Sequence, residues 1–207
     1  MEIEGRRIID RVIHACLQTK ANHRVVVVLP EPDRGSDLHE AVSRWETSGA
    51  KLWFGSEANV ASRFQGAFRR YRELLDEEDD SCGLIRVCAD RPFLQPSFLD
   101  ELDHRRYPEP LLYNHAPFGE EIGPTGLGAE SIVKSLAVDL FAVSSEAILS
   151  KEHVTLNLYS DDLVARHWVP PSWLPKNFQG RFDVDETTDL DLANFRRDAL
   201  VAVGLQP

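Results

Sequence analysis

Two short apolar runs constrain the fold of this 207-residue chain more than any other feature. Residues 25–29 read Val-Val-Val-Val-Leu, and such a continuous run is typical of a strand that is buried on both faces. Residues 84–89 form a second apolar run, interrupted only by Arg86, which also predicts a buried strand. Strands covered on both faces need helices on both sides of their sheet, which predicts the α/β class.

Segments whose apolar residues follow a helical period alternate with these strands. We expect helices near residues 7–19, 38–49, 58–75, 97–104, 138–149, 152–159 and 187–202, and further strands at residues 51–54, 111–113 and 164–169. Residues 115–130 are rich in Gly and Pro and are expected to form a long binding or lid loop. Without a composition shift or an internal repeat, the pattern predicts one domain, residues 1–207, built on a single doubly wound, mostly parallel sheet.

Composition excludes some classes of function. The chain has 23 Lys and Arg against 34 Asp and Glu, a formal net charge of −11, which argues against a nucleic-acid binder. No apolar run approaches the ~18 residues of a membrane-spanning helix, and no apolar core follows the charged N-terminus as in a signal peptide. The three cysteines lack metal-ligand spacing, which favours reduced thiols and a cytoplasmic protein without a membrane partner.

Asp90 is the first candidate for a functional residue. It follows directly after the second buried strand, and Pro92 prevents the strand from continuing. Ligands of parallel α/β sheets bind just beyond the carboxyl ends of the strands, so Asp90 stands where a divalent cation or a substrate would lie. The alternative is a strand-end Asp that only caps the next turn.

Five ordered motifs carry a resemblance to a known family. They are Gly55-Ser56-Glu57 with Val60 and Arg63-Phe64, then Arg86 with Asp90 and Pro92, Gly126-Leu127 with Glu130, Glu152-His153-Val154-Thr155, and Val184-Asp185 with Asp189-Leu190. Together they resemble the cytidylyltransferases of the nucleotide-diphospho-sugar transferase fold, in particular the spore coat polysaccharide biosynthesis type. CMP-sialic acid and CMP-KDO synthetases are more distant relatives of that type. The resemblance covers nearly the whole chain.

The resemblance implies a reaction in which CTP and an acidic or amino sugar give a CMP-sugar and pyrophosphate. It implies that Asp90 and Asp185 are catalytic and hold Mg²⁺, which usually takes one or two protein carboxylates. From the residues alone, Asp185 could instead cap the segment that begins at Thr187. The resemblance also implies that Asp90 and Asp185 face one crevice. Two carboxylates close together should repel, and a bound cation would relieve that repulsion.

Further site residues follow from the matched motifs. The resemblance implies nucleotide binding by Gly55, Ser56 and Asn59. It implies substrate binding by Arg63, Arg86, Glu130, Glu152, His153 and Thr155, the two arginines being able to hold phosphate or carboxylate bidentately. By themselves, Arg63 could be an exposed helix residue, His153 a structural histidine, and Glu152 and Thr155 the start of a helix.

The chain departs from the family pattern in two places. Arg91 stands where a small residue is commoner, and a cation there would compete with the metal or pair with one of the carboxylates. The first strand and the phosphate loop of the family are missing before residues 4–8, which match the start of the family's first helix. A longer natural chain, a loop supplied by a partner or second copy, and a degenerate member that binds without turnover are the three explanations.

The alternatives are therefore a cytidylyltransferase, a catalytically silent binding or assembly subunit, and an unrelated flavodoxin-like domain in which residues 152–155 lie away from Asp90. We also expect a homodimer, from the resemblance and, more weakly, from Trp168 and Trp173 in a Pro-rich segment.

Overall fold

Helices and strands alternate along the chain and build layers around two groups of strands. The computed structural model describes residues 1–3, 5–20, 24–75, 82–105, 111–113, 126, 129–143, 149–160 and 182–190. The strands are β1 (Glu2–Ile3), β2 (Arg6–Arg7), β3 (Val26–Pro30), β4 (Lys51–Gly55), β5 (Gly83–Arg86), β6 (Leu111–Tyr113) and β7 (Glu130–Val133). The α-helices are α1 (Ile8–Leu17), α2 (Asp37–Ser43), α3 (Val60–Arg70), α4 (Pro96–Arg105) and α5 (Lys134–Val138), which continues as one π-helical turn, Asp139–Val143.

The first group of strands is the parallel pair β3 and β4. Its register runs from Val26 opposite Lys51 to Pro30 opposite Gly55. Side chains alternate across the pair, so Val27 and Leu29 pack with apolar residues of α1 and α2. The other face meets α3, where the Trp53 ring lies so close to Gly66 that a Cβ there would stand 2.8 Å from a ring carbon. Helices therefore cover both faces of this pair.

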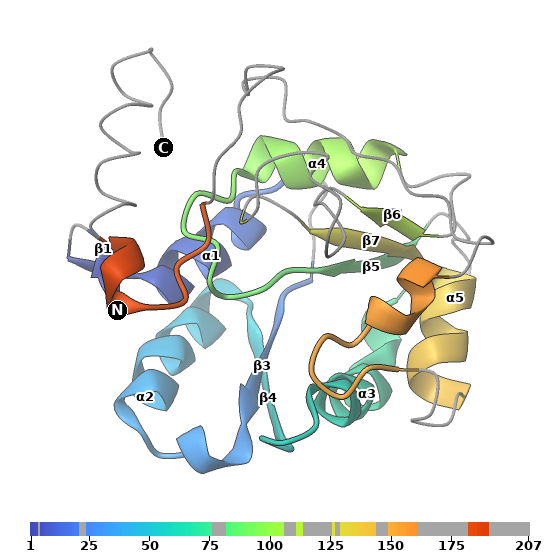
Figure 1. Ribbon diagram of the computed structural model, residues 1–207, viewed down its shortest axis with the longest axis horizontal. Coiled ribbons are helices and arrows are strands. Elements are labelled where there is room, and N and C mark those ends of the chain that lie inside the picture. The colour runs from blue at the N-terminus through green and yellow to red at the C-terminus, as the bar shows by residue number, and fades with distance from the viewer. Residues whose placement is uncertain are drawn as a thin grey trace.

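The second group is the three-stranded sheet β5-β7-β6, in which β7 runs antiparallel to both neighbours. Leu84 and Ile85 of β5 point to opposite faces. Leu84 packs against the apolar cluster formed with α3 and α5, and Ile85 packs against the cluster formed with α1 and α4. The sheet is therefore the middle layer between α4 on one side and α3 with α5 on the other (Figure 1).

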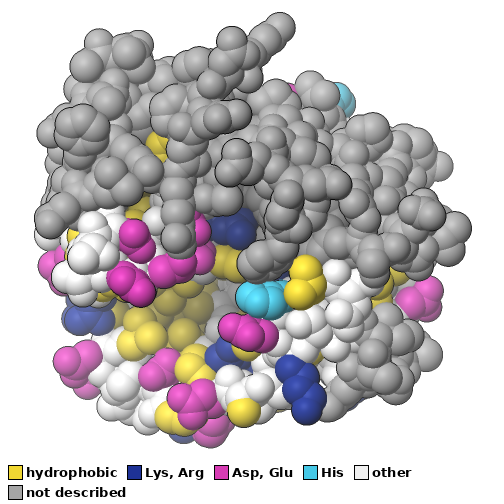
Figure 2. All heavy atoms as spheres, viewed as in Figure 1, with side chains coloured by type: hydrophobic (Ala, Val, Ile, Leu, Met, Phe, Trp, Pro, Cys, Tyr) yellow, Lys and Arg dark blue, Asp and Glu magenta, His cyan; other side chains and the backbone are white. Residues whose placement is uncertain are grey.

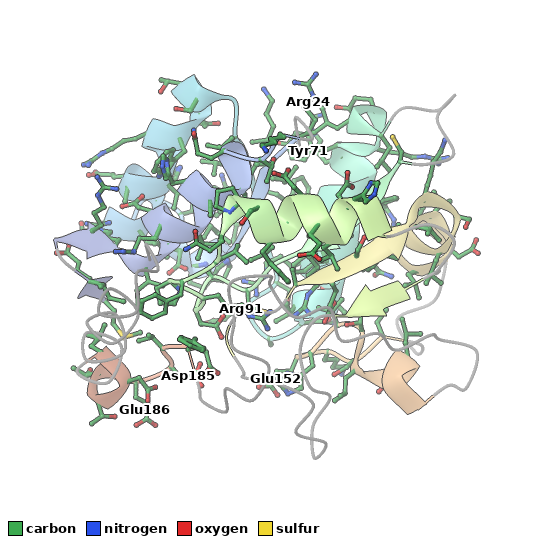
Figure 3. The ribbon with its side chains drawn as sticks, turned by 90° about the horizontal axis from the view of Figure 1, so that it is seen from above. Arg24, Tyr71, Arg91, Glu152, Asp185 and Glu186 are labelled. Atoms are coloured by element: carbon green, nitrogen blue, oxygen red, sulfur yellow. The ribbon has the colours of Figure 1, made fainter. Side chains whose placement is uncertain are left out.

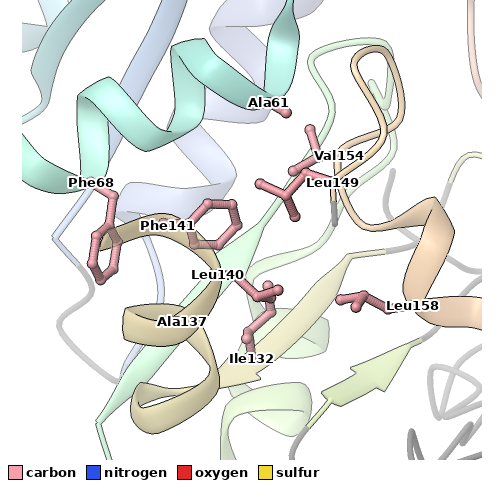
Figure 4. Close-up of a cluster of buried hydrophobic side chains, with 9 residues drawn as sticks. All are labelled: Ala61, Phe68, Ile132, Ala137, Leu140, Phe141, Leu149, Val154 and Leu158. Carbon is pink, nitrogen blue, oxygen red and sulfur yellow. The ribbon is translucent and has the colours of Figure 1, made fainter. Parts of the chain in front are cut away.

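The cluster beneath β7 is the part of the core that bears on the site. It joins nine buried side chains from α3, β7, α5 and the segment around residues 149–158, and Figure 4 shows all of them. Phe141 is fully buried and its ring lies 5.7 Å from that of Phe68, centroid to centroid. Burying a side chain of this size contributes about 1.5–3 kcal/mol. This cluster fixes the segment that follows residue 149 against the sheet.

Most expected elements are present, with local differences. The N-terminus forms a hairpin of β1 and β2 around Gly5, whose φ is +70°, before α1 begins at Ile8. The expected helix over residues 152–159 was wrong in its first half. Residues 151–155 form a turn, and only a 3₁₀ helix, Leu156–Ser160, follows, because paired backbone hydrogen bonds between Ser150 and Val154 close the chain first.

The sheet arrangement also differs from the expectation. The described strands form one parallel pair and three antiparallel pairs in three small sheets. Strand β7 begins at the last residue of the loop predicted over residues 115–130 and was not itself predicted. The expected strand at residues 164–169, Trp168, Trp173 and most of the expected helix over residues 187–202 lie outside the described residues. In the part of the chain that the structure describes, no helix has both the length and the apolar character needed to cross a lipid bilayer.

Candidate active site

Three aspartates gather just beyond the end of β5. Asp90, Asp183 and Asp185 each offer a carboxylate oxygen, and these three oxygens lie within 4.8 Å of one another. Asp90 and Asp183 are half-buried and Asp185 is exposed. The sequence-based pairing of Asp90 with Asp185 is therefore present in the geometry, and Asp183 joins them. We call Asp90, Asp183 and Asp185 the acidic trio.

Backbone contacts hold the two segments of the acidic trio together. The N–H of Val184 donates to the carbonyl of Asp90 over 2.9 Å, which places residues 183 and 185 on either side of that bond. Phe182 and Val184 are buried while Asp183 and Asp185 are more exposed, the alternation of an extended segment. The rings of Phe93 and Phe182 meet edge to face, with centroids 5.8 Å apart, and anchor both segments beneath the carboxylates.

Gly126 allows a third segment to approach the acidic trio. Its φ is +81°, and a Cβ at this position would lie 1.9 Å from the backbone nitrogen of Asp183. Only glycine fits such a contact, because any side chain would collide with the backbone that carries Asp183 and would also strain the left-handed conformation. Gly126 of the Gly-Leu motif therefore contributes packing at the site.

The charges of the trio are only partly compensated. Burial raises the pKa of the Asp90 carboxyl above its ordinary value; Arg91 opposes this rise, and Asp185 and Asp183 add to it. The Nε atom of Arg91 lies 3.7 Å from Oδ1 of Asp90, too far for a hydrogen bond. Both atoms are buried and have no hydrogen-bond partner among the described residues.

The donor set of the trio suits a hard divalent cation. Mg²⁺ prefers carboxylate oxygens and keeps part of its water shell. A buried carboxylate oxygen without a hydrogen bond, close to two further carboxylates, is a place where such a cation lowers the electrostatic free energy. The trio therefore fits the magnesium expected from the sequence, with Arg91 as the nearest competing cation.

A second polar group lies in the core beside the sheet. Arg86 on β5 stands opposite Glu130 on β7, and its Nη1 atom donates to Oε1 of Glu130 over 2.9 Å. Thr155 Oγ1 donates to the other carboxylate oxygen, Oε2, over 2.8 Å. The side chains of Arg86 and Glu130 are 10% and 3% exposed, and Thr155 is fully buried. These three predicted substrate ligands are thus bonded to one another, and their contact with substrate stays a prediction.

The start of α3 places the predicted nucleotide-binding residues. Asn59 caps the helix by accepting the N–H of Ser62 over 2.9 Å, and Ser56 accepts the N–H of Asn59 over 3.0 Å. The N–H of Val60 donates to the carbonyl of Lys151 over 2.7 Å. Since these N–H groups already have acceptors, the helix start itself does not offer them to a phosphate.

Arg63 lies directly beneath Gly55. A Cβ at Gly55 would stand 3.1 Å from Cγ of Arg63, so the glycine gives the arginine side chain its room. Burial lowers the pKa of the Arg63 guanidinium, while the nearby Asp33 and Glu57 raise it. Its Nε atom is buried without a hydrogen bond among the described residues. This state fits the predicted role of Arg63 as a ligand of an anionic group.

The candidate residues gather on one side of the molecule. Asp185 and Glu152 come from separate segments and lie toward the same side, Arg91 lies nearer the middle, and Arg24, just before β3, lies on the opposite side (Figure 3). Residues from separate segments of the chain therefore share the side of the molecule that carries Asp185 and Glu152. Figure 2 shows this face, with acidic side chains along one side of a hollow that has apolar side chains in its floor, and a histidine across from them.

Sequence reasoning missed Asp183 and the positioning role of Gly126. The alternation Phe182-Asp183-Val184-Asp185 holds the signal for Asp183, because residues two apart in an extended segment share a face. No local signal marks Gly126 as a contact of Asp183, since the two are distant in sequence.

Comparisons with known proteins place the fold. No family model and no curated protein matches the chain. Among solved structures, a cytidylyltransferase from Leptospira borgpetersenii is similar over 96% of this chain and 79% of its own, with a TM-score of 0.70 and 15% identity. The 4-diphosphocytidyl-2C-methyl-D-erythritol synthase of Anaerococcus prevotii is similar over 95% and 88%, with a TM-score of 0.61 and 13% identity. Rv0371c from Mycobacterium tuberculosis gives a TM-score of 0.62 at 10% identity, over 94% and 87%.

These similarities establish a mixed helix and sheet fold of the kind found in cytidylyltransferases. The low identities limit what they establish to the fold, so the activity has to be argued from the residues.

Proposed function

We propose that this protein is a cytidylyltransferase that joins CTP to an acidic or amino sugar and releases pyrophosphate. The observation that carries the proposal is the acidic trio at the end of β5, in a fold whose solved neighbours include cytidylyltransferases. Nucleotidyl transfer concentrates negative charge on phosphate oxygens, and a carboxylate-bound cation is the usual means of compensating it. The fold part of the proposal is a single doubly wound sheet of the nucleotide-diphospho-sugar transferase type.

Asp90, Asp183 and Asp185 would hold Mg²⁺ in this reaction. When bound, the metal supplies the positive charge that polarises the phosphate and favours departure of pyrophosphate. Asp183 was absent from the predicted ligand set, and its carboxylate oxygen within 4.8 Å of those of the other two makes it the third candidate ligand.

Two arginines would provide charge from the protein itself. Arg91 lies 3.7 Å from Asp90 and compensates part of the charge of the trio before any ligand binds. The guanidinium of Arg63, beneath Gly55, can turn its free hydrogen-bonding capacity toward a phosphate, because a planar guanidinium binds phosphate oxygens in pairs. Gly55, Ser56 and Asn59 would then shape the nucleotide side through backbone and packing, since the caps of α3 already use the Ser56 and Asn59 oxygens.

Glu152 and His153 would form the acceptor side. The side chain of Glu152 is 83% exposed and that of His153 is 43% exposed, so both can reach a bound sugar. Hydroxyl and ammonium groups donate to a carboxylate, and an imidazole can donate or accept. An enzyme with this pairing fits the synthesis of activated sugars for polysaccharides, and we propose that it works as a homodimer.

A catalytically silent binding subunit is the second candidate. It is favoured by the start of α3, whose first N–H groups are already bonded to Lys151 and Asn59. It is also favoured by Arg91, whose positive charge already compensates part of the negative charge of Asp90. This candidate predicts nucleotide or sugar binding without turnover.

The deciding experiment measures pyrophosphate release from CTP and Mg²⁺ with a panel of sugar acids and amino sugars. We expect release with at least one acceptor, and we expect Asp90→Asn and Asp185→Asn each to remove it. Glu46→Gln, which changes an exposed carboxylate on a 3₁₀ helix, is the matched control and should remain active. CTP binding without release across the panel would favour the silent subunit, and full activity of either Asn variant would remove that residue from the site.

A further inference from the structure

The turn that carries Glu152 and His153 is held in an unfavourable backbone conformation. Val154 has a φ of +55°, in the left-handed region that β-branched residues rarely adopt. Such a conformation persists only where the surroundings determine it, and it is common in functional sites.

Backbone hydrogen bonds fix both sides of the turn. The N–H of Ser150 donates to the carbonyl of Val154 over 2.9 Å, and the N–H of Val154 donates to that of Ser150 over 3.0 Å. Between them, the carbonyl of Lys151 accepts the N–H of Val60 at the start of α3 over 2.7 Å. The turn is thus closed on itself and bonded to a long helix.

Packing and one buried hydrogen bond complete the attachment. The Val154 side chain is fully buried in the core cluster beside Leu149, as Figure 4 shows. The next residue, Thr155, donates its hydroxyl to Glu130, and the other oxygen of Glu130 accepts from Arg86 on β5. The buried ion pair therefore connects the turn to the strand after which Asp90 lies.

A buried ion pair is weak evidence for stability, because the cost of removing both charges from water can exceed their attraction. Here its geometry serves another purpose, since Glu130 uses its two oxygens to bond a strand and a turn at the same time. In the turn, Lys151 and Glu152 are exposed and His153 is partly exposed, whereas Val154 and Thr155 are buried.

We propose that Glu130 and Thr155 are positioning residues that hold this strained turn, so that Glu152 and His153 form a preorganised pair for the sugar acceptor. The inference rests on the proposed function and refines it: of the predicted substrate set, Glu130 and Thr155 do not touch the acceptor, whereas Glu152 and His153 do. Preorganisation should strengthen acceptor binding, because two side chains that are already held in place lose little conformational entropy when the acceptor binds.

Thr155→Val tests the inference with little change in shape, since valine keeps the branched side chain and loses the hydroxyl. Thr155→Ser is the matched variant, because it keeps the hydroxyl that bonds Glu130. Hydrogen exchange would be followed at the amides of Ser150, Val154 and Val60, which form the bonds of the turn. We expect Thr155→Val to raise these exchange rates roughly fivefold, which corresponds to the loss of one net hydrogen bond. The exchange rates of the amides in the β3–β4 pair should not change. Thr155→Ser should exchange like the wild type.

Kinetics of the two variants test the consequence for the acceptor. With glucosamine and glucuronate as probes of the two acceptor classes, Thr155→Val should raise the KM for the productive acceptor and leave the KM for CTP unchanged. Unchanged exchange in Thr155→Val, or raised exchange with an unchanged acceptor KM, would overturn the inference. If the wild-type protein transfers no cytidylyl group to any acceptor, the proposed function fails separately, and the exchange rates still decide whether Thr155 and Glu130 hold the turn.

Discussion

Replacing Gly126 by alanine should disable the acidic trio through backbone geometry alone. The added Cβ would lie 1.9 Å from the backbone nitrogen of Asp183, whereas real Cβ contacts essentially never fall below 3.0 Å. The difference, 3.0 − 1.9 = 1.1 Å, is the least shift that the two segments must share. Because ligand sets need to be held to within about 0.5 Å, a shift of this size at Asp183 should weaken cation binding strongly.

The stability cost of the same change has two parts. An alanine at a φ of +81° costs about 1–2 kcal/mol relative to glycine. Relief of the collision adds to it, since overpacking costs typically 1–3 kcal/mol. Gly35→Ala is the matched control, because its φ is +83° but nothing lies within 4 Å of the new Cβ. It should therefore show the first cost without the second.

The assay combines Mn²⁺ binding, followed by electron paramagnetic resonance as a probe of the Mg²⁺ site, with urea unfolding. We expect Gly35→Ala to bind Mn²⁺ like the wild type, and Gly126→Ala to bind it at least tenfold more weakly, within the ~10²-fold that a 1 Å misplacement can cost. Wild-type Mn²⁺ affinity in a folded Gly126→Ala variant would refute the reasoning, as would equal losses of affinity in both variants.

Two further predictions concern the charges of the trio. Arg91→Gln should tighten Mn²⁺ binding about fivefold or more, because two unit charges ~4 Å apart interact by about 1 kcal/mol even in water. Arg70→Gln, which changes an exposed arginine, is the control. Unchanged affinity in Arg91→Gln would show that Arg91 does not compete with the metal for Asp90. Asp90→Asn should raise the urea midpoint at neutral pH, because the folded-state pKa of Asp90 is raised. The contribution of this carboxyl to the stability of the fold is fully present below the ordinary pKa of 3.8 and is lost as the pH rises through the raised pKa. A midpoint difference that does not change with pH across this window would contradict that origin.

Local patterns were enough to find the strands that lead to the site. The β-branched run before Pro30 became β3. The run before Asp90 became β5, but this strand ends at Arg86 and not at residue 89 as predicted, so Asp90 does not follow it directly. Apolar side chains of both strands pack against helices. The position of Asp90 beyond a strand end followed from Pro92 and the general location of ligand sites. These predictions depend on residues that are neighbours in sequence, which is why they could be made.

Features that depend on contacts between distant segments could not be predicted from the sequence. Glu130 follows a Gly-rich stretch and looks like the end of a loop, yet it begins β7, because its charge is matched by Arg86 on the neighbouring strand. The turn at residues 151–155 resembled the start of a helix. The paired backbone bonds between Ser150 and Val154, together with the bonds of Lys151 to α3 and of Thr155 to Glu130, explain why it is not. Each of these contacts joins segments that no periodic pattern connects.

The hydrogen-bonding state of the buried polar groups distinguishes residues that support the site from residues that are available to bind a ligand. Glu130 has both carboxylate oxygens bonded and Thr155 has its hydroxyl bonded, so neither needs a ligand to satisfy it. Asp90 Oδ1 and Arg91 Nε are buried beside each other without hydrogen bonds among the described residues. Since buried polar atoms are normally bonded, we expect a cation beside Asp90 Oδ1 and a phosphate oxygen beside Arg91 Nε to complete these two groups.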